Sequence, residues 1–591
     1  MRLFLRVLSL MVVVTPAVTW FAWDGALVWP LFGGATLSFD VTPLASFFLL
    51  LLAMGAPLAA LPMLRKEEPD WQLALFALLV LGMQGLLLAQ DLVGFFIGWE
   101  IMTWSSWLLI VRSPRTDAGT AASYILFNLS AAFLLLAGLL GVYSLTGSFA
   151  IQALVDLTLA QGLVLVLLFG AAFLIKIGTL PLHLWIPRSY DQAPEPVTVV
   201  LSALVSKMGV YGLLLMLILF PEMPGRWFGD WLNGPLSGYG LAWIGVITSI
   251  VATFKAIAQD DMKRLLAYSS IGQLGYVTTA IGVGGALGIS GALYHALVHT
   301  LVSLLLFISF AGIIAQTGQR RFNDLGELIY RMPISFFGVL IGIIALAGMP
   351  PLPGFASKFL IFVALIEAQW ILLFAAVILS SAAAFLYCYK LIYAPFLGQA
   401  NSPEARVARE APWPYLIPQI ILMGMLVGLG MFPGMGTALA DPVLAALGLA
   451  PLDGPSLGTL ATPYGGYDGV TLMLVFGIAF ALVTALFYML RGQLRRAGSR
   501  QDLSFAGEVP TPDQPLHYGA GMGRELRRIP LIGWILARSS SGFFSGLAER
   551  VERLAEHSSR LYPSQPWRWV QSFVVVFAVL LTWGLVRGGG L

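Results

Sequence analysis

Charge and cysteine are both scarce in this chain of 591 residues. Only 11% of the residues are charged, whereas a soluble globular domain carries roughly 25%. The single cysteine, Cys388, stands in an apolar run, which excludes an intrachain disulfide, a CxxC metal site and an iron–sulfur cluster. The net charge of +3 comes from dispersed basic residues, so we expect no nucleic-acid partner.

Apolar residues make up 58% of the chain. They form runs of roughly 20 residues from end to end, each long enough to span a bilayer as an α-helix. The sequence therefore predicts an all-α polytopic membrane protein. The fifteen candidate spans cover residues 3–22, 43–64, 71–90, 92–111, 121–145, 159–178, 193–220, 240–258, 264–283, 287–315, 334–367, 369–396, 414–434, 468–490 and 567–586.

Basic residues set the expected orientation, because Lys and Arg accumulate on the cytoplasmic side of membrane proteins. With the N-terminus in the cytoplasm, only Arg226 and Arg587 of the 33 Lys and Arg residues face outside. The first run follows Arg2 and Arg6 and so resembles a signal peptide; we expect an uncleaved first span.

The spans group into a predicted domain order. We expect N-terminal spans in 1–70, a first five-helix repeat in 71–220, an inverted second repeat in 240–396, additional spans in 414–490, a cytoplasmic linker with an amphipathic helix in 491–566, and a last transmembrane helix in 567–591.

The expected amphipathic helix lies in "SGFFSGLAERVERLAEHSSRLYP". Its apolar residues recur near helical spacing with charged residues between them, as in helices that lie along a membrane surface. We expect it to contact lipid headgroups or a partner; an ordinary loop helix is the alternative. Its apolar face comprises Phe543, Phe544, Leu547, Val551 and Leu554.

Several ionisable residues fall inside the apolar spans. A charge near the bilayer centre costs at least ~2.5 kcal/mol on insertion scales, so such residues mark ion or proton paths by default. A buried lysine changes its protonation state readily when a carboxylate approaches or withdraws, and a neutral histidine can relay a proton. The candidate proton-path residues are Glu100, Lys176, Lys207, Lys255, His295, His299 and Lys358.

Each candidate also has a structural alternative. Lys255 lies four residues before Gln259 and could extend to the cytoplasmic face. His295 and His299, one helical turn apart, could be neutral core residues. They could also bind a metal, but no cysteine or carboxylate cluster is near in sequence, so we expect no metal. The remaining charges could form structural ion pairs.

Two proline clusters interrupt otherwise continuous spans. Lys176 precedes Pro181 by five residues, and Lys358 follows Pro353 by five. Proline breaks a helix, and a broken helix within a membrane is tolerated where it lines a polar cavity. The interrupted spans are the fourth of each group of five, which predicts an inverted repeat with a lysine at each break.

The motifs resemble a known family, the antiporter-like membrane subunits of respiratory complex I, multisubunit cation/proton antiporters and membrane-bound hydrogenases. The resemblance covers roughly residues 70–400. The motifs that carry it are "GWE" at Glu100, "KIGTLPLHLWIP…AP" around Lys176 and His183, "SKMGVYGLL" at Lys207, "QDDMKRLLAYSSIGQLGY" over 259–276, and "GFASKF" at Lys358.

The resemblance implies two interlocked inverted repeats and a set of roles. Glu100 and Lys176 would be the paired residues of the first half-channel, and Lys207 the bridging lysine. His299 would be the central histidine and Lys358 the exit residue. His183, Pro181 and Pro353 would belong to the gating loops.

The sequence also departs from the family pattern. "IPRSYDQAP" lacks an expected histidine, Ser303 stands where many relatives have lysine, and Lys255 replaces an apolar residue. Lys255 is therefore a candidate substitute for the lysine absent at Ser303.

The expected function is ion translocation without bond-making chemistry. We interpret the chain as a subunit of a larger redox-driven or antiporter complex in a prokaryotic inner membrane, moving protons or exchanging H⁺ for Na⁺. Its expected partners are other membrane subunits and lipids, and no motif indicates a flavin, quinone or other cofactor. A stand-alone secondary antiporter and a non-conducting scaffold are the alternatives.

Overall fold

The structure is a computed structural model. It describes residues 2–23, 25–30, 36–65, 67–155, 157, 159–219, 236–397, 402–452, 456–490 and 525–537. The expected amphipathic helix and the last span at 567–586 lie outside the described residues. Except for the last one, Pro530–Ala537, the helices discussed below lie wholly in one compact unit, Met1–Ile535.

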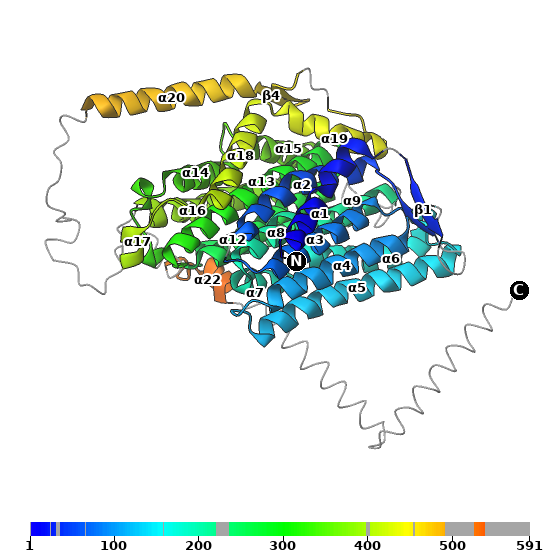
Figure 1. The fold of residues 1–591 in the computed structure, drawn as a ribbon. Helices are drawn as coiled ribbons and strands as arrows, with labels where there is room; N and C mark the ends of the chain where they lie inside the picture. Colours follow the sequence, from blue (N-terminus) through cyan, green and yellow to red (C-terminus); the bar gives the residue numbers. More distant parts are fainter. Residues whose placement is uncertain are drawn as a thin grey trace, which may run out of the picture. The chain divides into compact units, whose positions relative to one another are not determined.

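The chain is mostly helical (Figure 1). The longer helices are α1 (Arg2–Ala22), α2 (Pro43–Ala60), α3 (Asp70–Leu88), α4 (Leu92–Val111), α5 (Ala118–Thr146), α6 (Leu159–Ile177), α9 (Ser206–Leu219), α11 (Leu236–Ile257), α12 (Met262–Val283), α13 (Gly285–Thr317), α14 (Pro333–Ala347), α15 (Pro353–Glu367), α16 (Ile371–Ile392), α18 (Trp413–Met431), α19 (Gly434–Ala446) and α20 (Gly469–Leu490). The shorter ones include α7 (Trp185–Gln192), α8 (Glu195–Val200), the π-turn η4 (Leu201–Val205), α17 (Pro403–Val407) and α22 (Pro530–Ala537).

Eleven helical segments in the described part of the chain are long and apolar enough to cross a membrane. The protein is therefore a multi-pass membrane protein. Two shorter apolar stretches, Gly162–Ile177 of α6 and Pro333–Ala347 (α14), each end at a break in the chain.

The two breaks have similar local structure. Helix α6 ends at Ile177 and α7 begins at Trp185, while α14 ends at Ala347 and α15 begins at Pro353. A glycine with positive φ follows each first half, Gly178 at +80° and Gly348 at +77°. Glycine adopts this left-handed conformation without steric cost and so ends a helix.

Helix pairs α3/α4 and α11/α12 cross at glycines. A Cβ on Gly82 of α3 would lie 2.7 Å from the Met102 backbone nitrogen of α4. On α11, a Cβ on Gly245 would lie 2.5 Å from the Thr279 nitrogen of α12. Small residues let transmembrane backbones approach closely, so these crossings hold the first two helices of each expected repeat together.

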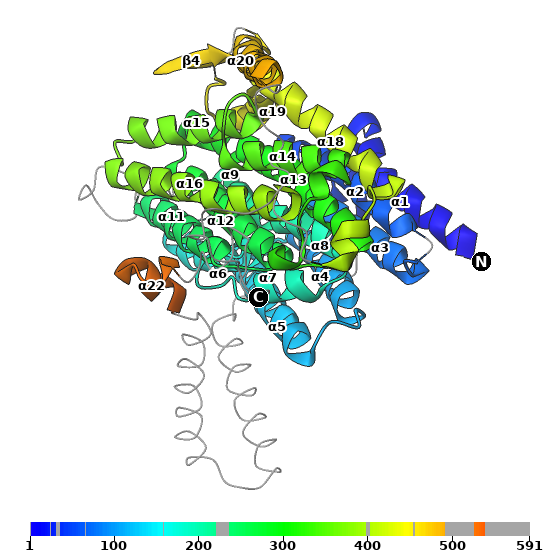
Figure 2. The ribbon, with the colours of Figure 1, turned by 90° about the vertical axis from the view of Figure 1, so that its left-hand side faces the viewer.

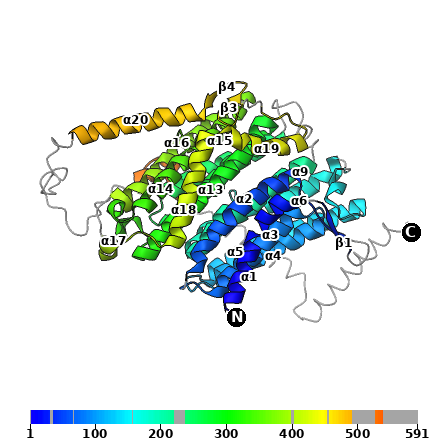
Figure 3. The same ribbon diagram turned by 45° about the horizontal axis from the view of Figure 1, so that its top comes forward.

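Helix α13 is the central element of the unit. The most apolar stretch of α13 is wholly buried, and the helix packs against α2, α8, α12, α14, α15, α18 and α19. Figures 2 and 3 show it between the earlier helices, in blue to cyan, and the later ones, in green to yellow. Residues on every face of α13 therefore meet protein.

Sequence analysis missed three local features. Residues 185–192 form α7, where a loop is expected from the "IPRSYDQAP" stretch. Helix α19 occupies part of the expected loop 435–467; it is short and contains Pro442, so it carries no spanning signal. The span 193–220 contains the π-turn η4 directly before Lys207. Turns of this kind occur often at functional sites.

A candidate proton path

Lys176 is fully buried in the last turn of α6. Its Nζ donates a 2.9 Å hydrogen bond to Oδ1 of Asn128 on α5. It also lies 5.2 Å from the centre of the Trp99 ring of α4, close enough for a cation–π contact. Both partners are neutral, so the site can hold the lysine with or without its proton.

Glu100 lies one residue after Trp99 on α4 and is half-buried. Its Oε2 accepts a 2.8 Å hydrogen bond from Trp104 Nε1, and its Oε1 has no hydrogen-bond partner among the described residues. Glu100 and Lys176 interact electrostatically, but they form no ion pair in the described part of the chain. The two residues that the resemblance pairs are thus charge neighbours without direct contact.

Lys207 connects the earlier helices with α13. Its Nζ donates a 2.7 Å hydrogen bond to the Ser202 carbonyl inside the π-turn. The same nitrogen lies 3.1 Å from Nδ1 of His299. Both side chains are almost completely buried, so the contact lies away from bulk water.

His295 lies one turn from His299 on α13 and contacts the second half. Its Nδ1 lies 2.9 Å from Oγ of Ser357 on α15, and its Nε2 lies 3.1 Å from Oε1 of Gln273 on α12. Gln273 Nε2 donates in turn to the Tyr387 hydroxyl at 3.1 Å. Both ring nitrogens therefore have polar partners, as a relay requires.

Lys358 uses the backbone groups released by the second break. Its Nζ donates to the carbonyls of Ala347 at 2.8 Å and Leu346 at 3.2 Å, at the C-terminal end of α14. Ser381 Oγ accepts a third hydrogen bond at 3.1 Å. Unpaired carbonyls and the helix dipole favour a cation at this end. Pro353 forms the first residue of α15 and so fixes the break.

Lys255 lies beside the first break. Its ammonium faces the Tyr268 ring of α12 at 5.9 Å, and its charge acts on His183 in the break. Two turns earlier on α11, the Thr248 hydroxyl accepts a 3.0 Å hydrogen bond from the Leu180 amide, next to Pro181. His299 instead has Lys207 and His295 as its charged neighbours.

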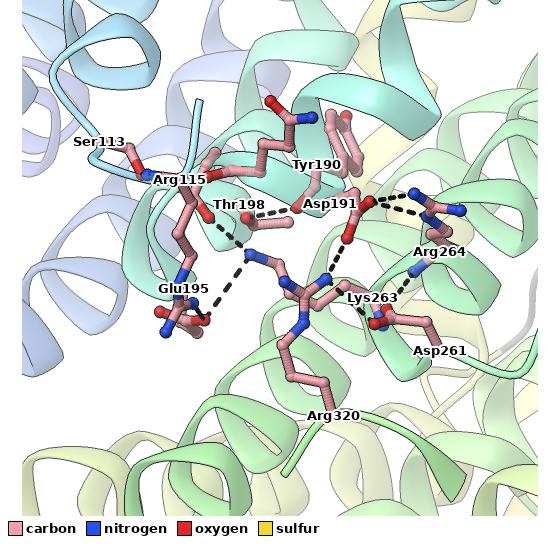
Figure 4. A network of polar contacts seen from close by, with 12 residues as sticks. Ser113, Arg115, Tyr190, Asp191, Glu195, Thr198, Asp261, Lys263, Arg264 and Arg320 are labelled. Carbon is pink, nitrogen blue, oxygen red and sulfur yellow. Dashed lines mark hydrogen bonds and ion pairs between the residues drawn. The ribbon is translucent and has the colours of Figure 1, made fainter. Parts of the chain in front are cut away.

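An ion-pair network lies at the ends of these helices (Figure 4). Asp191 of α7 binds Arg264 of α12 at 2.6 Å and also binds Arg320, which follows α13. Arg320 additionally binds Asp261 at 3.1 Å. Burial lowers the pKa of Arg320, but the Asp261 and Asp191 carboxylates outweigh this and raise it.

A second part of the same network joins α8 to its neighbours. Glu195 accepts a 2.5 Å hydrogen bond from Arg115 and lies 3.9 Å from the buried Lys263 ammonium. Lys263 donates a 2.6 Å hydrogen bond to the Ala193 carbonyl. The segment that follows the first break is thus tied to α12 by charged groups.

A polar cavity of about 380 Å³ adjoins the network. The start of α5, helix α7 and the start of α12 line it, and they contribute Asp117, Arg188, Asp191, Arg264 and Tyr268. Tyr268 is also the ring that Lys255 faces. The cavity is large enough for water.

Comparison with known proteins identifies the family. Residues 89–383 match the family described as "NADH:quinone oxidoreductase/Mrp antiporter, TM". NADH-quinone oxidoreductase subunit N of Desulforudis audaxviator is 30% identical over 428 residues, which cover 68% of this chain and 83% of that protein. The chain belongs to this antiporter-like family.

Other relatives come from different complexes. A Na(+)/H(+) antiporter subunit of Alkalihalophilus pseudofirmus is 29% identical, and the match covers 73% of this chain but only 56% of that longer protein. A chain in the structure of the membrane-bound sulfane sulfur reductase, an archaeal respiratory membrane complex, is 28% identical with a TM-score of 0.84. That match covers 98% of this chain and 95% of that one.

The sequence of this antiporter-like protein indicated the ionisable residues inside its helices but not their hydrogen-bond and ion-pair partners. It gave no role to Asn128, the acceptor for Lys176, or to Asp191 and Arg320 of the network. Asn128 is the only amide side chain of α5, a 29-residue helix that has no charged residue, a signal that could have been noticed. The partners of Asp191 lie 73 and 129 residues away, and a single sequence does not pair such distant residues.

Proposed function

We propose that the protein translocates protons, or exchanges H⁺ for Na⁺, as one subunit of a larger membrane complex in a prokaryotic inner membrane. The Lys207–His299 contact is the observation that carries this proposal, because it connects two sets of buried ionisable residues. The named relatives support it: they are subunits of a quinone oxidoreductase and of a Na(+)/H(+) antiporter.

The proposed architecture has fifteen spans with a cytoplasmic N-terminus and two inverted repeats, 71–220 and 240–396. The similar breaks, with Gly178 and Gly348 in the same conformation, support the repeat. Spans in 1–70 and 414–490, the surface helix in 491–566 and the last span in 567–591 complete it. Labelling a cysteine placed at Ser545 from each side of the membrane tests the topology, and labelling only from outside contradicts it.

In the proposed first half-channel, Glu100 controls the proton on Lys176. A nearby carboxylate favours the ammonium form, and desolvation opposes it. Trp104 holds the Glu100 carboxylate through one oxygen, which leaves the other free to turn toward Lys176. Movement of this carboxylate would therefore switch Lys176 between holding and releasing a proton.

In the proposed connection, the proton passes through the histidines of α13. Lys207 gives its proton to His299 across their contact, and His295 passes charge on toward Ser357 and Lys358. Lys358 is the exit residue, since the carbonyls of the broken helix stabilise its ammonium form until a competing base appears.

Lys255 and His183 are the proposed inlet of the first half. The polar cavity reaches Tyr268, Lys255 faces that ring, and His183 lies in the break that follows Lys176. In this proposal Lys255 delivers protons to the first break. It therefore does not act as the substitute for the lysine absent at Ser303.

Transport by inverted membrane vesicles tests the function. We expect Lys176→Ala and Glu100→Ala to abolish ion movement while the complex still assembles. The control is Arg6→Met, which removes a partly buried arginine of α1 that binds Asp70 of α3, away from this path. Normal transport by both path variants would favour the non-conducting scaffold, and full transport by the chain purified without partners would favour the stand-alone antiporter.

A further inference from the structure

Three buried polar atoms between α13, α14 and α18 have no hydrogen-bond partner among the described residues. They are Oγ of Ser309 and both Oε1 and Nε2 of Gln419. Both side chains have no exposed surface. Because both ends of the Gln419 amide are unsatisfied, exchanging its oxygen and nitrogen does not remove the problem.

Two of the unsatisfied atoms, Ser309 Oγ and Gln419 Oε1, face the same point on α14. A Cβ on Gly338 would lie 2.9 Å from Gln419 Oε1 and 2.9 Å from Ser309 Oγ. Any other residue at position 338 would therefore press on both groups. Buried polar groups are normally hydrogen-bonded, and these two convergent oxygens meet the minimum of two partners that an internal water needs.

Further polar groups lie one turn from this point, toward the start of α14. One turn before Gly338, the buried Ser335 donates a 2.8 Å hydrogen bond to Oε1 of Glu410. Glu410 is half-buried and also accepts a 2.7 Å hydrogen bond from the Ile334 amide. One further water would span the single turn, roughly 5–6 Å, between Ser335 and the cluster.

An apolar layer separates the cluster from Lys358. The carbonyl of Leu346, which binds Lys358, lies eight residues beyond Gly338 on α14, or roughly 12 Å along the helix. Leu305 and Leu306 fill the interval beside Gly342. Hydrophobic constrictions of this kind stop conduction until water enters them.

We propose that Ser309 and Gln419 hold an internal water, and that this water is the inner end of a proton path from Glu410 to the Lys358 side of the molecule. The water site stands on its own geometry, whereas the path rests on the proposed translocation function. Each hop breaks one O–H bond and forms another, so Ser335 and the waters end each cycle unchanged. The leucine layer closes the path when it is dry.

The first test is a structure of the whole complex at a resolution that reveals ordered water. We expect density within hydrogen-bond distance of both Ser309 Oγ and the Gln419 amide. An empty, dry space between these side chains would overturn the water site.

The second test is transport by Gln419→Met in vesicles containing the assembled complex. This variant keeps the length of the side chain but removes its polar atoms. We expect transport to fall roughly tenfold, the effect of losing one hydrogen bond to a proton-carrying water. Gln419→Asn retains the amide and should keep most of the activity, a rescue that a packing role would not produce.

Two comparisons complete the design. Ser309→Ala combined with Gln419→Met should be little worse than Gln419→Met, because both act through one water. Gln72→Met on α3 is the control, because Gln72 is also buried and its amide nitrogen is also unsatisfied among the described residues. This variant should transport normally.

Ordered water together with normal transport by Gln419→Met would overturn the path. If Lys176→Ala, Glu100→Ala and Lys207→Met also transport normally, the chain is a scaffold and the translocation function itself fails. If these three variants are inactive, only the path is wrong.

Discussion

Lys207 Nζ on α9 and His299 Nδ1 on α13 lie 3.1 Å apart in a fully buried site. We expect Lys207→Met to reduce transport by roughly a hundredfold, the lower range for losing a positioned proton donor. Because an apolar side chain of similar size replaces a buried charge, thermal stability should be unchanged or higher. Vesicle transport and a melting curve of the same preparation give both numbers. Normal transport would exclude this contact as the connection between the halves.

Gly348 is the position where the second break meets Lys358. A Cβ there would lie 2.6 Å from Lys358 Cδ, so Gly348→Ala should displace the ammonium from the carbonyls of α14 and slow transport. Gly147→Ala is the matched control, since Gly147 has a similar φ of +69° but open space around it. Each variant should lose about 1 kcal/mol of stability through backbone strain. Equal transport by the two variants would contradict a role for the Lys358 position.

Asn128 is the neutral hydrogen-bond acceptor of the Lys176 ammonium. Asn128→Asp adds a carboxylate next to the ammonium, which should hold Lys176 in its protonated form. A shift of one pKa unit changes the protonation equilibrium roughly tenfold, so we expect transport to slow by at least about this factor. Asn128→Gln keeps a neutral acceptor and serves as the control. A faster Asn128→Asp protein would mean that proton uptake, rather than release, limits the cycle.

Asp191 holds two arginines at the cytoplasmic end of the proposed topology. Asp191→Asn leaves Arg264 and Arg320 without their shared carboxylate, and we expect a loss of about 2–3 kcal/mol in stability because the aspartate is largely buried. The exposed Arg528–Glu525 pair is the comparison. Glu525→Gln should change stability by less than about 1 kcal/mol. Similar melting temperatures for the two variants would show that the network is not structural.

Lys255 faces the Tyr268 ring and belongs to the proposed inlet with His183. We expect Lys255→Met to slow transport severalfold, and Lys255→Arg to restore part of the rate if position and charge suffice. Arginine does not release its proton under ordinary conditions, so the two variants separate a guiding charge from a proton carrier. Unchanged transport in Lys255→Met would favour a lysine that only extends to the surface.

The helices of the membrane region could be predicted from the sequence, because a long apolar run satisfies its backbone hydrogen bonds in a bilayer by forming an α-helix. The expected span 92–111 coincides with α4, and the proline clusters mark both breaks. The contact between Lys207 and His299 was not readable, since it joins residues 92 positions apart. Helix α19 was also missed, because it is too short to give a spanning signal. The Ser309–Gln419 cluster was missed because single polar residues in two distant helices do not show in the sequence that they lie close together.

The burial of the most apolar stretch of α13 has a consequence for biosynthesis. This helix ends at Thr317, whereas α18, one of the helices that covers it, ends at Met431. At 5–20 residues per second, the ribosome needs roughly ten seconds to complete the intervening chain. During that interval one side of α13 lacks its final neighbour, and Ser309 on that side would face lipid or insertion machinery. Nascent chains stopped just before α18 should therefore be the most vulnerable to membrane proteases.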